Sequence, residues 1–199
     1  MFIPSVLSWK EKNVEITQFT DFPYEDEVHF KIATEEPSQF TVYLRHPSWS
    51  KNVDVKINGK KLRVRTNSNG YIEIDRTWKS GDEIFVKYHM DLHWEYTTDN
   101  KNIAALLYGP VVLAGKLGTE GMKAPAPYSN PKLYNDYYTY DYNIPENIEN
   151  KAIVKSIKPE RSFVKKGDGL KFISDKGVEL EPLFDVHRQR YAVYWKIEE

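Results

Sequence analysis

Residues 53–64 read VDVKINGKKLRV, and this stretch decides the fold class. Asn58-Gly59 is the residue pair favoured by a type I′ turn, in which both central residues adopt positive φ. A two-residue loop of this kind places Val55 directly opposite Leu62, on the apolar face of the two strands. The turn chemistry and the hydrophobic pattern therefore predict the same β-hairpin.

The hairpin register extends to two further pairs. It places Val53 opposite Val64 on the apolar face and Asp54 opposite Arg63 on the polar face. An opposite-charge pair across two strands contributes about 0.2–1 kcal/mol. We expect both pairs to stabilise the hairpin.

Apolar and polar residues alternate through much of the chain. Further alternating apolar positions are Val28, Phe30 and Ile32; Phe40, Val42 and Leu44; Ile72 and Ile74; and Ile84, Val86 and Tyr88. A period of two puts one face of a strand on a core and the other in water, which is typical of antiparallel sheet. Turn residues recur at 67–70 and 80–82. Short strands separated by such turns predict a sandwich or a barrel.

Composition divides the chain into three parts. Residues 1–115 are expected to form a first β-sandwich, which closes with an apolar run broken by Gly109-Pro110. Residues 116–150 are rich in Pro, Asn, Gly and Tyr, which predicts a long connection that packs onto its neighbours through tyrosine rings. Residues 151–199 are expected to form a second, small β unit that leans on the first. The predicted fold class is all-β: an antiparallel, jelly-roll-like β-sandwich followed by a second smaller β-sandwich unit.

Charge and composition exclude several classes of protein. The 199 residues carry a net charge of -1, so no global field attracts nucleic acid. Apolar runs are far shorter than the ~20 residues that span a bilayer, and no secretory signal follows Met1. The absence of cysteine removes disulfides, thiolate nucleophiles and cysteine–zinc sites. Neither nucleic acid nor membrane is an expected partner, and the sequence leaves the localisation open.

Two carboxylate clusters and two histidines are the candidates for catalytic or metal-binding groups. A glycosidase needs two carboxyls ~5–10 Å apart on opposite sides of a cleft. The acidic residues of 25–27 and of Glu35-Glu36 are adjacent in sequence, so we expect them to lie in solvated turns. His89 and His93 would lie ~13–14 Å apart in a strand, too far to share a metal ion. Neither a nucleophile elbow nor a phosphate-binding glycine motif occurs. We therefore expect no catalytic, cofactor-binding or metal-binding residue.

Basic and aromatic side chains leave two interpretations open. The basic group at the hairpin comprises Lys56, Lys60, Lys61, Arg63 and Arg65. It is either a solvated face that discourages edge-to-edge pairing or a surface for an acidic partner. The five tryptophans are Trp9, Trp49, Trp78, Trp94 and Trp195. They either fill cores or stack on sugar rings.

Several segments, taken in order, resemble one family of enzymes. The first are FIPS (2–5) leading to Trp9, QFTDFP (18–23) and LRHPSWS (44–50). VKING (55–59), GYI (70–72), WKSGD (78–82) and AALLYGPVVLA (104–114) follow. PLFDVH (182–187), Arg190-Tyr191 and Tyr194-Trp195 complete the series. The chain thus resembles the C-terminal region that follows the catalytic barrel in β-L-arabinofuranosidase-type glycoside hydrolases, family 127 and its relatives.

The resemblance implies a non-catalytic role. Members of that family carry an (α/α)6 barrel whose cysteines and a glutamate hold zinc and whose cysteine attacks the sugar. None of those residues can be assigned to this cysteine-free sequence, so the resemblance implies no cofactor within it. The implied function is a β-sandwich accessory module that braces its own catalytic barrel and contributes to contacts in a homodimer. The alternative is a carbohydrate-binding module for arabinose-containing plant glycans.

Five residues are candidates for glycan or interface contact. They are Trp49, Trp94, His187, Arg190 and Tyr191. Anchoring of the last strands is the alternative role of the polar cluster 187–191. One departure from the family pattern, histidine before Met90 where proline is usual, lies at a loop or strand edge and leaves the resemblance intact.

Overall fold

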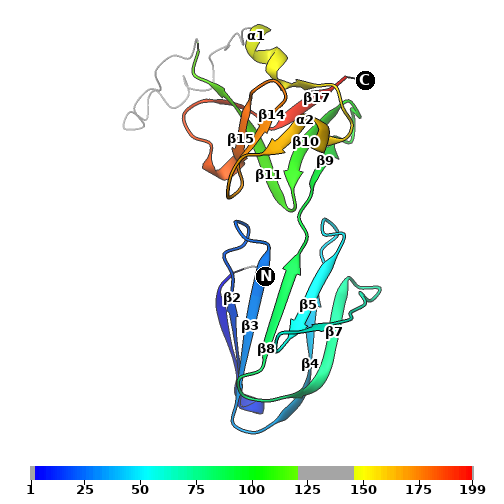
Figure 1. Ribbon diagram of the computed structural model, residues 1–199, viewed down its shortest axis with the longest axis vertical. Coiled ribbons are helices and arrows are strands. Elements are labelled where there is room, and N and C mark those ends of the chain that lie inside the picture. The colour runs from blue at the N-terminus through cyan, green and yellow to red at the C-terminus, as the bar shows by residue number, and fades with distance from the viewer. Residues whose placement is uncertain (1–2, 121–145, 199) are drawn as a thin grey trace. The chain divides into compact units, whose positions relative to one another are not determined.

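The computed structural model describes residues 3–120 and 146–198, which form two compact units (Figure 1). The first contains Met1–Leu92 and Tyr108–Val111, and the second contains His93–Leu107 and Val112–Glu199. The chain therefore divides near Leu92 and not at residue 115 as expected. Most of the expected tyrosine-rich connection, residues 121–145, lies outside the described residues.

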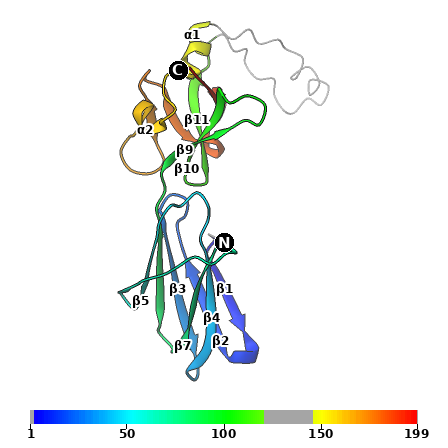
Figure 2. The same cartoon turned by 90° about the vertical axis from the view of Figure 1, so that its right-hand side faces the viewer.

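The first unit is built from two antiparallel sheets (Figure 2). The six-stranded sheet has the order β1-β2-β3-β8-β5-β6. Its strands are β1 (Ser5–Trp9), β2 (Val14–Phe19), β3 (Glu27–Thr34), β5 (Val53–Ile57), β6 (Lys60–Leu62) and β8 (Glu83–Tyr88), with the short helix η1 (Lys10–Lys12) between β1 and β2. The smaller sheet pairs β4 (Ser38–Arg45) with β7 (Tyr71–Trp78). Among the described residues, the other edge of β4 has no strand partner.

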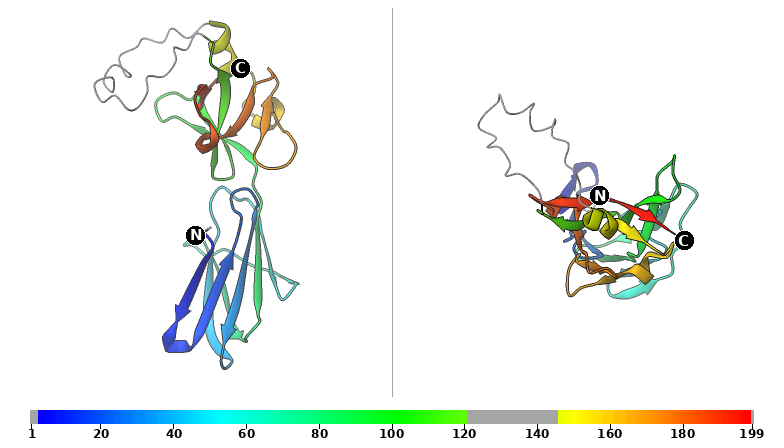
Figure 3. Two further views of the ribbon diagram at one scale, coloured as in Figure 1. Left: turned by 90° about the vertical axis from the view of Figure 1, so that its left-hand side faces the viewer. Right: turned by 90° about the horizontal axis from the view of Figure 1, so that it is seen from above.

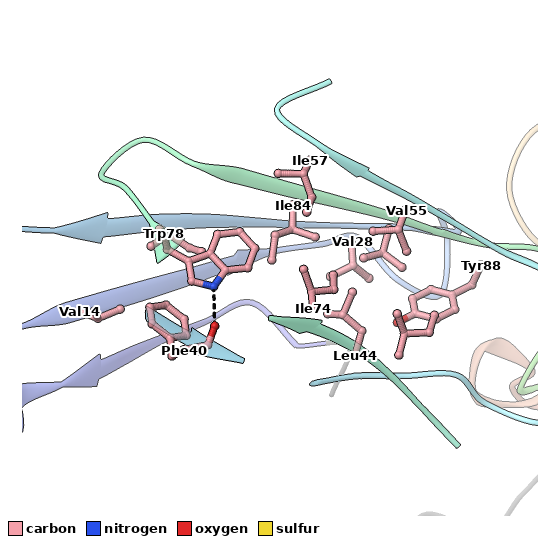
Figure 4. Close-up of a cluster of buried hydrophobic side chains, with 13 residues drawn as sticks. Val14, Val28, Phe40, Leu44, Val55, Ile57, Ile74, Trp78, Ile84 and Tyr88 are labelled. Atoms are coloured by element: carbon pink, nitrogen blue, oxygen red, sulfur yellow. Dashed lines mark hydrogen bonds between the residues drawn. The ribbon is translucent and has the colours of Figure 1, made fainter. Parts of the chain in front are cut away.

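The core of the first unit lies between these sheets (Figure 4). The six-stranded sheet contributes Val14, Val28, Ile32, Val55, Ile57, Ile84, Val86 and Tyr88, and the smaller sheet contributes Phe40, Leu44, Ile72, Ile74 and Trp78. Apart from Val14 and Trp78, these are positions that the period-two pattern assigns to one face, and the predicted all-β, sandwich-like fold class is confirmed. Near one end of this core, where β7 ends and β4 begins, the fully buried Trp78 stacks on Phe40, with ring centroids 5.8 Å apart.

The hairpin β5–β6 confirms part of the predicted register. Val55 pairs with Leu62, and Asn58 and Gly59 have φ values of 50° and 77°, as a type I′ turn requires. The β5–β6 ladder ends at Leu62, so the predicted pairing of Val53 with Val64 is wrong. On the other edge of β5, Val53 pairs with Tyr88 of β8.

The predicted pairing of Asp54 with Arg63 also fails. Asp54 Oδ1 instead lies 2.6 Å from Nζ of Lys61, one diagonal step along the hairpin. A lysine side chain is long enough for this diagonal contact, and the position of Arg63 lies beyond the last paired residue of β6.

Nine strands of the second unit form one hydrogen-bonded sheet (Figure 3). Its order is β12-β17-β10-β11-β15-β14-β13, with β9 added to β10 and β16 added to β11. The strands are β9 (Leu92–Tyr96), β10 (Ile103–Tyr108), β11 (Val111–Gly118), β12 (Ile153–Val154), β13 (Phe163–Lys165), β14 (Phe172–Ser174), β15 (Glu179–Pro182), β16 (Arg190–Ala192) and β17 (Tyr194–Ile197). The short helices are α1 (Glu146–Glu149), η4 (Asn150–Ala152), α2 (Pro159–Ser162) and η5 (Leu183–Asp185).

Pairing across the chain explains where the second unit begins. β10 pairs with β17, and β11 pairs with β15 and β16, so the strands before residue 120 join those after residue 150. The two units are consequently of comparable length, although the second was expected to be the smaller.

Trp195 anchors the core of the second unit. It is fully buried, and Phe163 meets it edge-on with ring centroids 5.0 Å apart. A Cβ atom added at Gly115 would lie 2.8 Å from Cζ2 of Trp195, so only glycine fits beneath this ring. No helix of the described residues has the length and apolar character needed to cross a membrane.

Candidate functional site

Four side chains line up across the outer face of the six-stranded sheet. Register places Phe19 of β2 beside His29 of β3, His29 beside Phe85 of β8, and Phe85 beside Lys56 of β5. Their sequence neighbours point into the core, and side chains alternate along a strand, so this row faces away from the core. We call the hollow that it lines the aromatic groove.

The aromatic groove combines rings with cations. The ring of His29 meets that of Phe85 edge-on at 4.9 Å, and Lys56 Nζ lies 5.0 Å from the centroid of the same ring. Phe19 leaves 53% of its surface exposed at one end. Lys31 and Glu83 also line the groove, whose volume is about 440 Å³. It therefore offers apolar ring surface and several hydrogen-bonding groups together.

The next row of the same face is a network of ion pairs. Lys87 Nζ lies 3.2 Å from Asp26 Oδ1 and 3.1 Å from Glu27 Oε1. Hydrogen bonds to these carboxylates, first to Glu27 and then to Asp26, raise the pKa of Lys87. The predicted carboxylate cluster 25–27 is thus tied to a lysine by two of its members.

Asp54 belongs to a second group of paired charges. It accepts hydrogen bonds from Lys61 Nζ and, at 3.0 Å, pairs with His89 Nε2. The hydrogen bond from Lys61, followed by that from His89, lowers the pKa of Asp54 to about 2. His89 is therefore a hydrogen-bond partner of Asp54. The described residues contain no group of three or more side chains that could hold a metal ion.

An apolar trough opens at the side of the first unit where β4 has its free edge. It has a volume of about 290 Å³ and is lined by Leu7, Ile16, Phe30 and Val42 among others. Leu7 pairs with Ile16, which puts it on the inner face of the sheet, yet 56% of its surface is exposed. The two-stranded sheet is too narrow to cover β1 and β2, so we refer to this hollow as the open trough.

The two tryptophan candidates are half-buried in different units. Trp49 lies 6.0 Å, centroid to centroid, from both Phe22 and Tyr88 and packs against the first core. Trp94 meets Phe163 edge-on at 5.7 Å, and its Nε1 is buried without a hydrogen-bond partner among the residues that the structure describes. Trp78 and Trp195 are fully buried core residues.

The polar candidates lie at the end of the second unit. Arg190 Nη1 donates a hydrogen bond to the carbonyl oxygen of Glu120, and Tyr191 pairs with Lys116 of β11. His187 is exposed in the loop before β16. Adjacent residues of a strand point to opposite faces, so the structure does not gather Arg190 and Tyr191 into one site.

Sequence reasoning missed the aromatic groove. Lys56 was noted only as part of a basic group, and Phe19, His29 and Phe85 were not singled out. Each outward position could be recognised from the period-two pattern. The order of β2, β3, β8 and β5 in the sheet could not be recognised in this way. β8 lies between β3 and β5, and both of these strands come much earlier in the sequence.

Comparisons with known proteins agree with this fold. Residues 1–90 match the family described as Beta-L-arabinofuranosidase, GH127 middle domain. No curated protein sequence matches the chain. Among solved structures, a GH127 β-L-arabinofuranosidase from Geobacillus stearothermophilus T6 is similar over 100% of this chain, with a TM-score of 0.63 and 17% identity. A GH127 β-arabinofuranosidase, BT3674, is similar over 98%, with a TM-score of 0.58 and 18% identity.

The similarity covers only part of the matched structures. The chain covers 33% of each of the two arabinofuranosidases, and it therefore spans about a third of the structures that it matches. The expected assignment of the whole chain to a C-terminal region is not confirmed, because the matching family is a middle domain. The first unit thus resembles the GH127 middle domain in sequence, and the chain shares its fold with about one third of the length of each of these two structures.

Proposed function

We propose that this chain is a non-catalytic β-sandwich part of a GH127 β-L-arabinofuranosidase-like hydrolase and braces the domain that performs catalysis. The observation that carries the proposal is the match of residues 1–90 to a GH127 middle domain. Nearly the whole chain is similar in fold to about one third of the length of two such enzymes, and this similarity supports the proposal. In this proposal residues 93–199 form the part that follows the middle domain.

The contacts of the carboxylates support a structural role. Asp26 and Glu27 are paired with Lys87, and Asp54 is paired with Lys61. A glycosidase would need two carboxyls that face each other across a substrate cleft, one of them free to donate a proton. These acids instead connect neighbouring strands of one sheet.

The open trough is the surface that we assign to the neighbouring domain of the hydrolase. Leu7, Ile16 and Val42 present apolar surface there, and burying such surface contributes ~25 cal/mol per Å². A neighbouring domain that filled the trough would complete the side of the sandwich that the two-stranded sheet leaves uncovered.

Enzyme assays test the non-catalytic role. We expect the pure chain to release no aryl alcohol from an aryl β-L-arabinofuranoside. Turnover that persists after treatment with a chelator and further purification would refute the proposal.

A matched pair of substitutions tests the bracing surface. In a hydrolase that contains this chain, Leu7→Asp should lower the melting temperature and the activity. Val6→Asp is the control, because Val6 is similarly exposed, at 61% against 56%, but lies on the other face of β1. Equal effects of the two changes would contradict the assignment of the open trough.

Glycan binding is the second candidate function, and the aromatic groove is the feature that favours it. Isothermal titration of the chain with arabino-oligosaccharides tests it directly. Saturable binding that is lost on Phe85→Ala, in a variant that still folds, is the expected result for a carbohydrate-binding module. Binding unaffected by Phe85→Ala would place the glycan elsewhere.

A further inference from the structure

We propose that the aromatic groove binds a sugar that carries a carboxylate, such as a uronic acid unit of an oligosaccharide. This inference does not depend on the bracing role, because it concerns the outer face of the sheet and not the open trough. It deepens the second candidate function, glycan binding in the aromatic groove, by naming the class of sugar.

The floor of the groove suits a sugar ring. Phe19 and Phe85 come from β2 and β8, with His29 of β3 between them in the same row. The C–H groups of a sugar present an apolar face that can rest on such rings, and aromatic residues bring a large apolar surface to a contact. Phe19 is the exposed ring of the row and extends this surface to the edge of the groove.

The charges of the groove favour an acidic sugar over a neutral one. Lys31 and Lys56 line it, and neither has a carboxylate within ion-pair distance among the residues that the structure describes. Lys56 of β5 and His29 of β3 flank the ring of Phe85 from its two sides, and His29 Nε2 also lies 3.9 Å from Oε2 of Glu27. Glu83, the carboxylate of the lining, stands opposite Lys31 in the register, so Lys56 carries the excess positive charge of the lining.

Lys56 and Lys87 lie on the same face of the sheet but have different partners. Lys87 lies on the same face, and its charge is already neutralised by Asp26 and Glu27. Lys56 instead rests over an aromatic ring, an interaction that contributes only about 0.5–1 kcal/mol at an exposed site. A ligand carboxylate can compete with that contact, because charge-assisted hydrogen bonds contribute about 1.5–3 kcal/mol.

The size of the groove separates a sugar from a protein partner. Its volume of about 440 Å³ lies within the range of about 300–1,000 Å³ typical of small-molecule sites. A stable protein interface needs about 800 Å² of surface from each partner, which is much more than four side chains in one row provide.

Titration calorimetry with trigalacturonate, and with galactotriose as its neutral counterpart, tests the proposal on the full chain. We expect trigalacturonate to bind saturably and Lys56→Gln to weaken that binding about tenfold, as the loss of one charged hydrogen bond predicts. Lys10→Gln is the control, because Lys10 is an exposed lysine of η1 outside the groove. Equal binding of galactotriose, or equal effects of the two substitutions, would overturn the proposal.

A second variant and a second probe complete the test. Phe85→Leu keeps an apolar side chain but removes the ring, and it should weaken trigalacturonate binding while circular dichroism confirms the fold. Hexaglutamate carries carboxylates without sugar rings. If hexaglutamate bound as tightly as trigalacturonate, or if Phe85→Leu bound trigalacturonate normally, the groove would be a general anion site and the sugar assignment would fail.

Discussion

The indole Nε1–H of Trp78 donates a hydrogen bond of 2.9 Å to the carbonyl oxygen of Phe40, on the neighbouring strand of the small sheet. The same two rings stack on each other in the first core (Figure 4). One side chain therefore fills one end of the core and also satisfies a backbone carbonyl of β4.

Trp78→Phe should lower the free energy of unfolding of the first unit by about 2–4 kcal/mol. The change leaves a cavity and deprives the Phe40 carbonyl of its donor. Urea unfolding followed by far-UV circular dichroism measures the loss. Trp9→Phe, at a half-buried position of the same core, should cost less, and an equal cost would contradict the assignment of the loss to the full burial of Trp78.

Asp54 makes the stability of the first unit dependent on acid. Its pKa is lowered from 3.8 to about 2 in the folded chain, chiefly by the hydrogen bond from Lys61. A carboxyl with a depressed pKa stabilises the fold above its unfolded value, and this contribution is lost as the pH falls from about 4 through about 2. The side chain is about one third exposed, so solvent screening limits the effect to about 1 kcal/mol or less.

Asp54→Asn tests this dependence. The variant should be less stable at pH 7 and should show a smaller decrease in melting temperature between pH 4 and pH 2 than the original chain. Glu11→Gln, which removes an exposed carboxyl of η1, is the control. An unchanged acid profile in Asp54→Asn would show that the pair with Lys61 does not form in solution.

Gly115→Ala should destabilise the second unit by about 1–3 kcal/mol, because the new methyl group would overlap the ring of Trp195. Thermal unfolding measures the change. Trp195→Phe in the Gly115→Ala background should recover part of the loss, since the smaller ring leaves room for the methyl group. If the two substitutions had strictly additive effects, the contact would not be the cause.

Trp49→Ala should lower the free energy of unfolding of the first unit by about 1–3 kcal/mol, because the ring packs on Phe22 and Tyr88. Trp49→Phe should cost less. Chemical denaturation decides the role of this residue: unchanged stability in Trp49→Ala would favour a surface function such as glycan contact.

Local patterns in the sequence predicted much of the fold. Asn58-Gly59 was sufficient to predict the hairpin turn, and the pairing of Val55 with Leu62 followed from it. The turn and this pair both depend on interactions between residues close in sequence. The alternation around Val28 and Val86 likewise identified the faces of strands that proved to be neighbours.

Features that depend on distant pairing could not be predicted in the same way. β10 and β11 belong to the second unit because they pair with β15, β16 and β17, about 70 or more residues later. Periodicity assigns each strand a face but no neighbour. For the same reason it could not bring Phe19, His29 and Phe85 together, nor choose Lys61 over Arg63 as the partner of Asp54.

The free edge of β4 has a consequence for handling the protein. A strand edge without a partner exposes backbone N–H and C=O groups that can pair with another chain, and the apolar surface of the open trough lies beside it. Concentrated solutions of the chain should therefore form sheet-mediated aggregates beginning at β4. Replacing Thr41, an outward-facing residue at the middle of β4, by lysine should keep the chain in solution without disturbing the core.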